Sequence, residues 1–210
     1  MLDKNKFVLK EQTKMLSAKG VYDIIDADSN QPLGTAAPTK SGFMKTIMGL
    51  VLGKDNMSLT IEFRQKSDNA LLFSVRRKGL LFKKVQALDA QGQVLGSYKA
   101  KKFSLSGGFH IYDKDGKHFA EIKGKMFKSD YKFLTPDGKE MGTVSKTWGG
   151  MAKELLTSAG THVVVIAPAY ATDTTAKKLV LGAAIAINTA FKKKGGKGGG
   201  GESEESGGDE

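Results

Sequence analysis

Most of the chain alternates between apolar and polar residues in short runs separated by turns. Four stretches share one arrangement: an alternating strand, a turn rich in Asp, Gly and Asn, and a second alternating strand. Asp and Gly favour tight turns and the positive φ that such turns need, so each stretch predicts a β-hairpin. The four units are Tyr22–Asp26 with Leu33–Gly34, Val85–Asp89 with Val94–Gly96, Phe109–Asp113 with Phe119–Glu121, and Tyr131–Thr135 with Met141–Gly142.

The hairpins recur at a nearly constant spacing, and further strands lie between them. Asp89 and Asp113 are 24 residues apart, and Asp115 and Asp137 are 22 apart. About a dozen strands in roughly 170 residues predict a mainly β protein whose antiparallel sheet closes into a barrel, because an open sheet would leave long unpaired edges. The further strands are expected at Phe7–Gln12, Ser58–Gln65, Ala70–Arg77, Leu80–Leu88 and His162–Ala167.

Helical patterns are few, and the C-terminal one is the most informative. Helices are expected at Phe43–Leu52, Met151–Thr157 and Thr174–Lys193. The apolar run 179–191 has 13 residues, about 20 Å of helix, whereas a membrane span needs about 20 residues. The run is apolar nearly all round and rich in Gly and Ala, which favours a thin helix buried inside the barrel over a membrane anchor.

Composition adds limits on compartment and domain organisation. The chain has no cysteine, which excludes disulfides, thiolate metal sites and a cysteine nucleophile. The N-terminus has no apolar core of signal-peptide length, so we expect a cytoplasmic protein, associated at most peripherally with a membrane. We expect one domain over 1–194 and a disordered Gly-rich acidic tail over 195–210.

The net charge is +11, which favours partners such as an anionic membrane surface, nucleic acid or an acidic protein. Lysines that keep β-edges soluble are the alternative explanation. Alternate residues of a strand share a face, so Lys99 and Lys101 point the same way, as do Lys123 and Lys125. The predicted anion- and lipid-binding residues are Arg76, Arg77, Lys83, Lys84, Lys99, Lys101, Lys123 and Lys125.

The helix predicted at Phe43–Leu52 offers a second kind of contact. Phe43, Ile47 and Val51 fall on one helical face, which Met48 widens, with lysines on either side. This face could lie in a membrane interface, or it could cover the open end of the barrel.

Catalytic and metal-binding patterns are missing from the sequence. His110 and His118 flank one hairpin turn and could face each other, but no carboxylate cluster accompanies them, as a metal site would require. The Asp113–Gly116 turn lacks the glycine and glutamate spacing of a calcium-binding EF-hand loop. We therefore expect no catalytic residues, no metal, no cofactor and no enzymatic activity.

The repeated hairpins, of the form Tyr-Asp-Ile-Ile-Asp…Leu-Gly and Phe-His-Ile-Tyr-Asp…Gly, resemble those of the tubby C-terminal-like superfamily. The strand Thr161–Ile166, which leads into the small-residue apolar helix, fits the same pattern. The chain looks most like the LURP-one-related and phospholipid-scramblase-related branch over about residues 6–193. The resemblance implies a twelve-stranded barrel around a central C-terminal helix, and basic surface residues that bind lipid headgroups.

The resemblance also marks one departure. Scramblases are described as calcium-responsive, with an acidic segment before the final helix, whereas residues 167–175 here contain one acid, Asp173. We therefore expect no calcium site of that kind, because Ca²⁺ needs several oxygen ligands. The expected function is non-enzymatic binding of anionic phospholipid at a membrane surface. The alternatives are a nucleic-acid or acidic-protein binding module, and an intracellular structural or adaptor domain.

Overall fold

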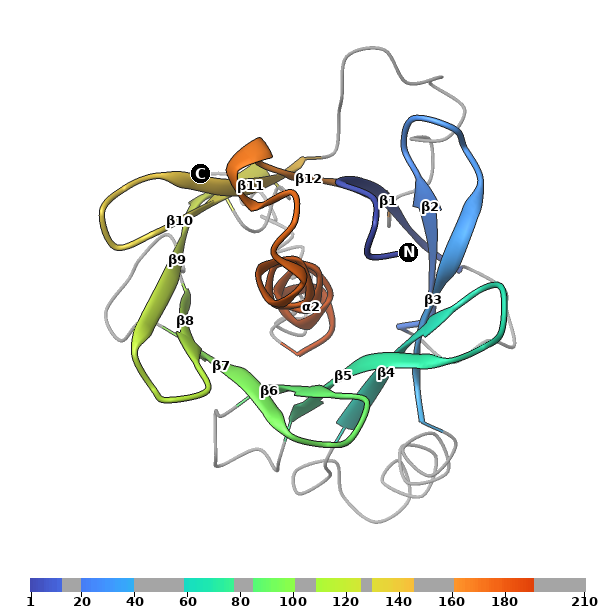
Figure 1. Cartoon of the computed structure of the whole chain (residues 1–210), viewed down its shortest axis with the longest axis horizontal. Helices are drawn as coiled ribbons and strands as arrows, with labels where there is room; N and C mark the ends of the chain where they lie inside the picture. Colours follow the sequence, from blue (N-terminus) through green and yellow to red (C-terminus); the bar gives the residue numbers. More distant parts are fainter. Residues whose placement is uncertain are drawn as a thin grey trace, which may run out of the picture.

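The structure is a computed structural model that describes residues 1–12, 20–39, 59–77, 85–100, 109–125, 130–145 and 161–190, without the side chains of residues 100, 125 and 186–190. Within these residues, twelve strands form one closed antiparallel barrel (Figure 1). Each strand pairs with its neighbours in sequence, and β1 pairs with β12 to close the ring. The predicted twelve-stranded barrel around a C-terminal helix is confirmed.

The strands agree closely with the alternating runs of the sequence. Every second residue of a strand faces the barrel interior, as in β10, where Tyr131 and Phe133 are buried and Lys132 between them is exposed. The elements are β1 (Lys6–Glu11), β2 (Tyr22–Asp26), β3 (Pro32–Pro38), β4 (Leu59–Gln65), β5 (Leu71–Arg77), β6 (Val85–Asp89), β7 (Val94–Ala100), β8 (Phe109–Asp113), β9 (His118–Lys125), β10 (Asp130–Leu134), β11 (Glu140–Ser145), β12 (Thr161–Ile166), the 3-10 helix η4 (Pro168–Tyr170) and the helix α2 (Thr174–Ala190).

The helix α2 runs through the middle of the barrel (Figure 1). Asp173 caps its start, because the Asp173 carboxylate accepts a hydrogen bond of 2.9 Å from the backbone N–H of Ala176. Consecutive residues from Leu179 to Leu181 and from Ala183 to Ile185 are at most 1% exposed, so every side of this stretch is buried. The predicted burial of the apolar helix inside the barrel is confirmed.

Two hairpin turns share one hydrogen-bonding scheme. The carboxylate of Asp89 accepts hydrogen bonds from the backbone of Gln91 and Gln93, and Asp113 does the same for the residues two and four positions later. Gly92 and Gly116 follow at φ of +83° and +80°, a region that glycine enters without a steric penalty. The repeated Asp and Gly of the sequence therefore form the same type of turn in both hairpins.

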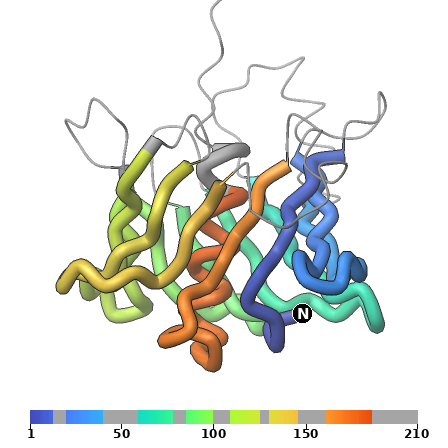
Figure 2. Tube along the Cα trace, turned by 90° about the horizontal axis from the view of Figure 1, so that it is seen from above, coloured from blue at the N-terminus to red at the C-terminus, as the bar shows by residue number. Residues whose placement is uncertain are grey.

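The antiparallel topology places alternate connections between strands at opposite ends of the barrel. The short turns 27–31, 66–70, 90–93, 114–117 and 135–139 all lie at one end of the barrel, together with residues 1–5 and 167–173 (Figure 2). We call this the turn end. At the opposite end, the strands are joined by the segments 13–19, 40–58, 78–84, 101–108, 126–129 and 146–160, whose structure lies outside the described residues. We call this the connection end.

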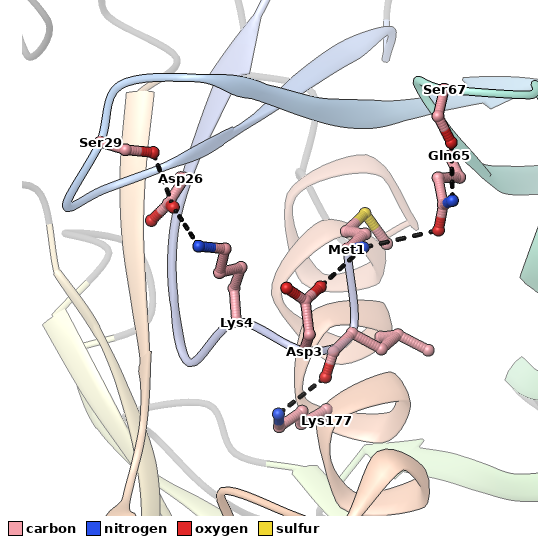
Figure 3. Close-up of polar contacts among 9 residues, drawn as sticks. Met1, Asp3, Lys4, Asp26, Ser29, Gln65, Ser67 and Lys177 are labelled. Carbon is pink, nitrogen blue, oxygen red and sulfur yellow. Dashed lines mark hydrogen bonds and ion pairs between the residues drawn. The ribbon is translucent and has the colours of Figure 1, made fainter.

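At the turn end, the N-terminal segment contacts the start of α2 (Figure 3). Lys177 of α2 is 1% exposed, and its Nζ donates a hydrogen bond of 2.7 Å to the backbone carbonyl of Leu2. Lys4 forms an ion pair of 3.0 Å with Asp26, which also accepts a hydrogen bond from Ser29. These contacts join the N-terminal segment to both the helix and the β2–β3 hairpin.

Candidate anion-binding end of the barrel

The two ends of the barrel differ in charge composition. The six segments that join strands at the connection end contain 13 lysines and only two acidic residues, Asp55 and Glu154. The turn-end segments contain six acidic residues and five lysines. The connection segments together carry a net charge of +11, and residues 191–210, which follow the far end of α2, add four lysines and five acidic residues. The excess positive charge is therefore attached to one end of the barrel.

Cations at the turn end have acidic partners close by. Lys114 lies 2.8 Å from Asp115, and Lys139 lies 2.9 Å from Asp137. Burial alone would raise the pKa of Asp26, but hydrogen bonds from Ser29, from Lys4 and from the backbone lower it below its usual value. Several charges of the turn end are thus neutralised locally.

Two of the predicted anion-binding residues lie at the end of β5, next to the connection end. Arg77 pairs in register with Val85, whose side chain belongs to the core. Arg77 lies two residues after the buried Val75 on the same strand, so its side chain starts from the inward face of the sheet. Arg76 pairs in register with Gln86, and its side chain starts from the outward face of the sheet. Both arginines are half-buried. The two guanidinium groups therefore start from opposite faces of the sheet, and Arg76 is the one that extends from the outer wall.

Lys99 extends from the outer wall of β7. Its Nζ lies 4.4 Å from the centroid of the Tyr112 ring on β8, a cation–π contact. Lys99 pairs in register with His110, so a lysine, a tyrosine and an imidazole lie together on the outside of the barrel. Tyr112 was not among the predicted site residues, although its place two residues after His110 on the same strand face would have indicated it.

Lys123 also lies on the outer wall, two strands away. Its Nζ is 2.7 Å from Glu121, and it pairs directly with Lys132 of β10. Lys132 in turn contacts Glu140 at 2.7 Å, a hydrogen bond that raises the pKa of Lys132. Lys125 is the last residue of β9 and therefore lies next to the connection end. The sequence interpretation missed Lys132, which the alternation of β10 could have identified.

The remaining predicted residues lie outside the described part of the chain. They are Lys83, Lys84 and Lys101, and the membrane-contact residues Phe43, Ile47, Met48 and Val51. The helices predicted at 43–52 and 151–157 and the tail over 195–210 also lie there. Lys83 and Lys84 directly precede β6, and Lys101 directly follows β7, so the chain attaches all three to the connection end.

Two further observations bear on function. Among the described side chains, no group of three or more His, Asp or Glu residues could hold a metal ion. Within the same part of the chain, no helix is long and apolar enough to cross a membrane.

Comparison with known proteins places this barrel in a class. A family model described as Scramblase matches residues 73–193, more than half of the chain. The chain therefore belongs to the Scramblase family. The family match and the barrel confirm the resemblance to the scramblase-related branch of the tubby-like proteins.

The fold comparison agrees with the family. The structure is similar to the X-ray structure of a protein from Arabidopsis thaliana, with a TM-score of 0.52 and 11% sequence identity. The match covers 88% of this chain and 92% of the Arabidopsis chain. At this identity the likeness shows the tubby-like barrel fold alone. A comparison with curated proteins found no match.

Proposed function

We propose that this scramblase-related barrel binds anionic phospholipid at a membrane surface without catalysing a reaction, and that its connection end faces the lipid. The observation that supports the proposal is the separation of charge between the two ends. Each lysine near an anionic bilayer contributes about 1 kcal/mol of attraction, and the contribution falls off within about 10 Å. Thirteen lysines attached to one end would therefore orient the barrel as well as hold it.

The outer wall supports an end-on arrangement over a sideways one. Several cations of the wall contact acidic neighbours, as Lys123 does with Glu121 and Arg64 with Glu62. Val94, at 38%, is the only large hydrophobic residue among the described side chains that is exposed. A wall on which several cations are paired, and whose described residues expose little apolar surface, favours end-on contact over sideways contact.

The apolar residues of the connection segments fit the same role. They include Phe43, Phe82, Phe103, Phe127 and Trp148, interspersed with lysines. Aromatic and basic residues in combination favour the boundary between headgroups and acyl chains. We do not extend the proposal to movement of lipid through the barrel, because α2 and the core side chains occupy its interior.

A charge-reversal experiment with a matched control tests the proposal. Lys83→Glu, Lys84→Glu and Lys101→Glu change the connection end, whereas Lys66→Glu, Lys114→Glu and Lys117→Glu make the same change in net charge at the turn end. Co-sedimentation with phosphatidylcholine vesicles, with and without phosphatidylserine, measures binding. We expect the connection-end variant to lose more than about tenfold in binding to anionic vesicles and the turn-end variant to change less than about threefold.

Salt, calcium and a competitor distinguish the alternatives. Binding should weaken between about 50 and about 150 mM salt, because exposed charges are screened, and it should not depend on calcium. Equal losses in both variants would contradict the proposed orientation. Absence of vesicle binding, together with DNA binding that the same lysines support, would favour the nucleic-acid alternative instead.

A further inference from the structure

Two histidines on the outer wall of the barrel lie in direct contact. His110 Nδ1 of β8 is 3.0 Å from His118 Nε2 of β9. Their ring centroids are 4.8 Å apart in an edge-to-face arrangement. Both rings are half-buried and share the outward face, because Phe109, Ile111 and Ala120 take the interior positions. The pair that the sequence allowed is therefore present.

The distance between the two nitrogens restricts the protonation of the pair. A contact of 3.0 Å is a hydrogen bond, so one nitrogen donates and the other accepts. The contact survives when the pair takes up one further proton, because a charged donor strengthens the bond. A second further proton leaves two N–H groups facing each other.

The charged groups around the pair come from all three strands of this wall. Lys99 of β7 pairs in register with His110, and Glu121 of β9 pairs with His110 from the other side. Glu121 is engaged by Lys123 at 2.7 Å. The Tyr112 ring lies 5.7 Å from the His118 ring and beneath Lys99. A proton added to the pair thus places a third positive charge between Lys99 and Lys123.

We propose that the His110–His118 pair is a proton-controlled part of the anion-binding surface, which strengthens the attraction of the barrel to phosphate-bearing headgroups as pH falls below neutral. The inference rests on the proposed function. Imidazole is the side chain that ordinarily changes charge between about pH 5 and pH 8. His110 is the second residue of β8, about 3.4 Å along the strand from the residue that starts at the connection end, whereas His118 is the first residue of β9 and directly follows the turn 114–117. A charge on His110 lies within a screening length of the connection end.

The test compares vesicle binding at about pH 8 and about pH 6. Phosphatidylglycerol vesicles are suitable, because their headgroup keeps its charge over this interval, and EDTA removes adventitious metal. One added charge near the surface corresponds to about a fivefold gain in the partition constant of the wild type. The double variant His110→Gln/His118→Gln should show almost no gain, although it retains His162 and every carboxylate. Lys99→Gln should bind more weakly at both pH values yet keep the fivefold ratio.

The outcomes separate this inference from the function on which it rests. An equal gain in the wild type and in the double variant would overturn the inference and leave lipid binding intact. A gain that appears only with added zinc would overturn it in favour of a metal site. Absence of binding at both pH values would contradict the proposed function and the inference with it.

Discussion

Lys177 and Asp26 are the charged side chains that are almost fully buried within the described part of the chain, at 1% and 2% exposure. The two side chains differ in their hydrogen-bond and ion-pair partners. Asp26 has a hydroxyl, an ammonium and a backbone N–H as partners, whereas the hydrogen bond from Lys177 goes to the carbonyl of Leu2. Burial lowers the pKa of Lys177 below its usual value, and the more distant charge of Asp3 only partly opposes this. Both pKa values are lowered, so both groups should make stability rise with pH, Asp26 in the acidic range and Lys177 in the alkaline range.

The substitution Lys177→Met should change how stability depends on alkaline pH. A folded-state pKa below the unfolded value of about 10.5 means that the folded state disfavours the charged amine. This cost is fully present below the folded-state pKa and disappears as pH rises towards the unfolded value. We expect the stability of wild type relative to Lys177→Met to increase between about pH 7 and pH 10. Urea unfolding of both proteins measures the difference, and a difference that stays constant would show that the amine is not destabilised by burial.

The substitution Asp26→Asn tests a buried charge that stabilises the folded state. The lowered pKa of Asp26 means that the carboxylate stabilises the folded state above the unfolded pKa of about 3.9, and that this stability is lost as pH falls through the lower folded-state value. At neutral pH we expect a loss of about 1–3 kcal/mol in the free energy of unfolding. Asp28→Asn is the control, because Asp28 is exposed and contacts only Lys6 with its carboxylate. Equal effects of the two substitutions would contradict the role of Asp26 at the β2–β3 turn.

The helix α2 and the barrel wall lie close together at Gly182. A Cβ atom at this position would lie 2.6 Å from the hydroxyl of Tyr98 and 2.9 Å from a methyl group of Val75. The same Tyr98 hydroxyl donates a hydrogen bond of 3.0 Å to the carbonyl of Leu179, one turn earlier in α2. The glycine thus brings the helix close enough for a side chain of the wall to bond its backbone.

The substitution Gly182→Ala should destabilise the protein although alanine favours helix by about 1 kcal/mol. Overpacking against Tyr98 costs about 1–3 kcal/mol, so a net loss is expected in thermal or urea unfolding. Tyr98→Phe removes the clashing hydroxyl together with its hydrogen bond. The double variant should therefore lose less stability than the sum of the single variants. Simple additivity, or stabilisation by Gly182→Ala alone, would mean that α2 is not packed in this way.

Regular elements were predictable from the sequence because their signals are local. The turns at Asp89–Gly92 and Asp113–Gly116 follow from residues that are three positions apart. The burial of α2 follows from its short, uniformly apolar run. Lys177 shows the limit of such signals: the sequence indicates only a lysine beside the apolar run, whereas the N-terminal segment, far away in sequence, covers it. The partners of Lys99 and Lys123 likewise depend on the register between strands.

The protein as a whole has a separation of charge along the barrel axis. Neither the repeated turns nor the lysine clusters reveal this separation on their own. It emerges because antiparallel pairing places alternate connections at opposite ends of the barrel. The basic clusters are visible in the sequence, whereas the end of the barrel to which they attach follows from the topology. A strongly positive end opposite a nearly neutral one defines a preferred orientation in the field of an anionic surface.

Fluorescent labelling at the two ends tests this orientation most directly. The chain has no cysteine, so Gln91→Cys at the turn end and Ser106→Cys in a connection segment each provide a unique site for an environment-sensitive dye. On phosphatidylserine vesicles, we predict a blue shift and quenching by lipid-attached quenchers for the label at residue 106 and an unchanged spectrum for the label at residue 91. A shift of the label at residue 91, or equal shifts of both labels on vesicles that bind the protein, would contradict end-on binding through the basic end of the barrel.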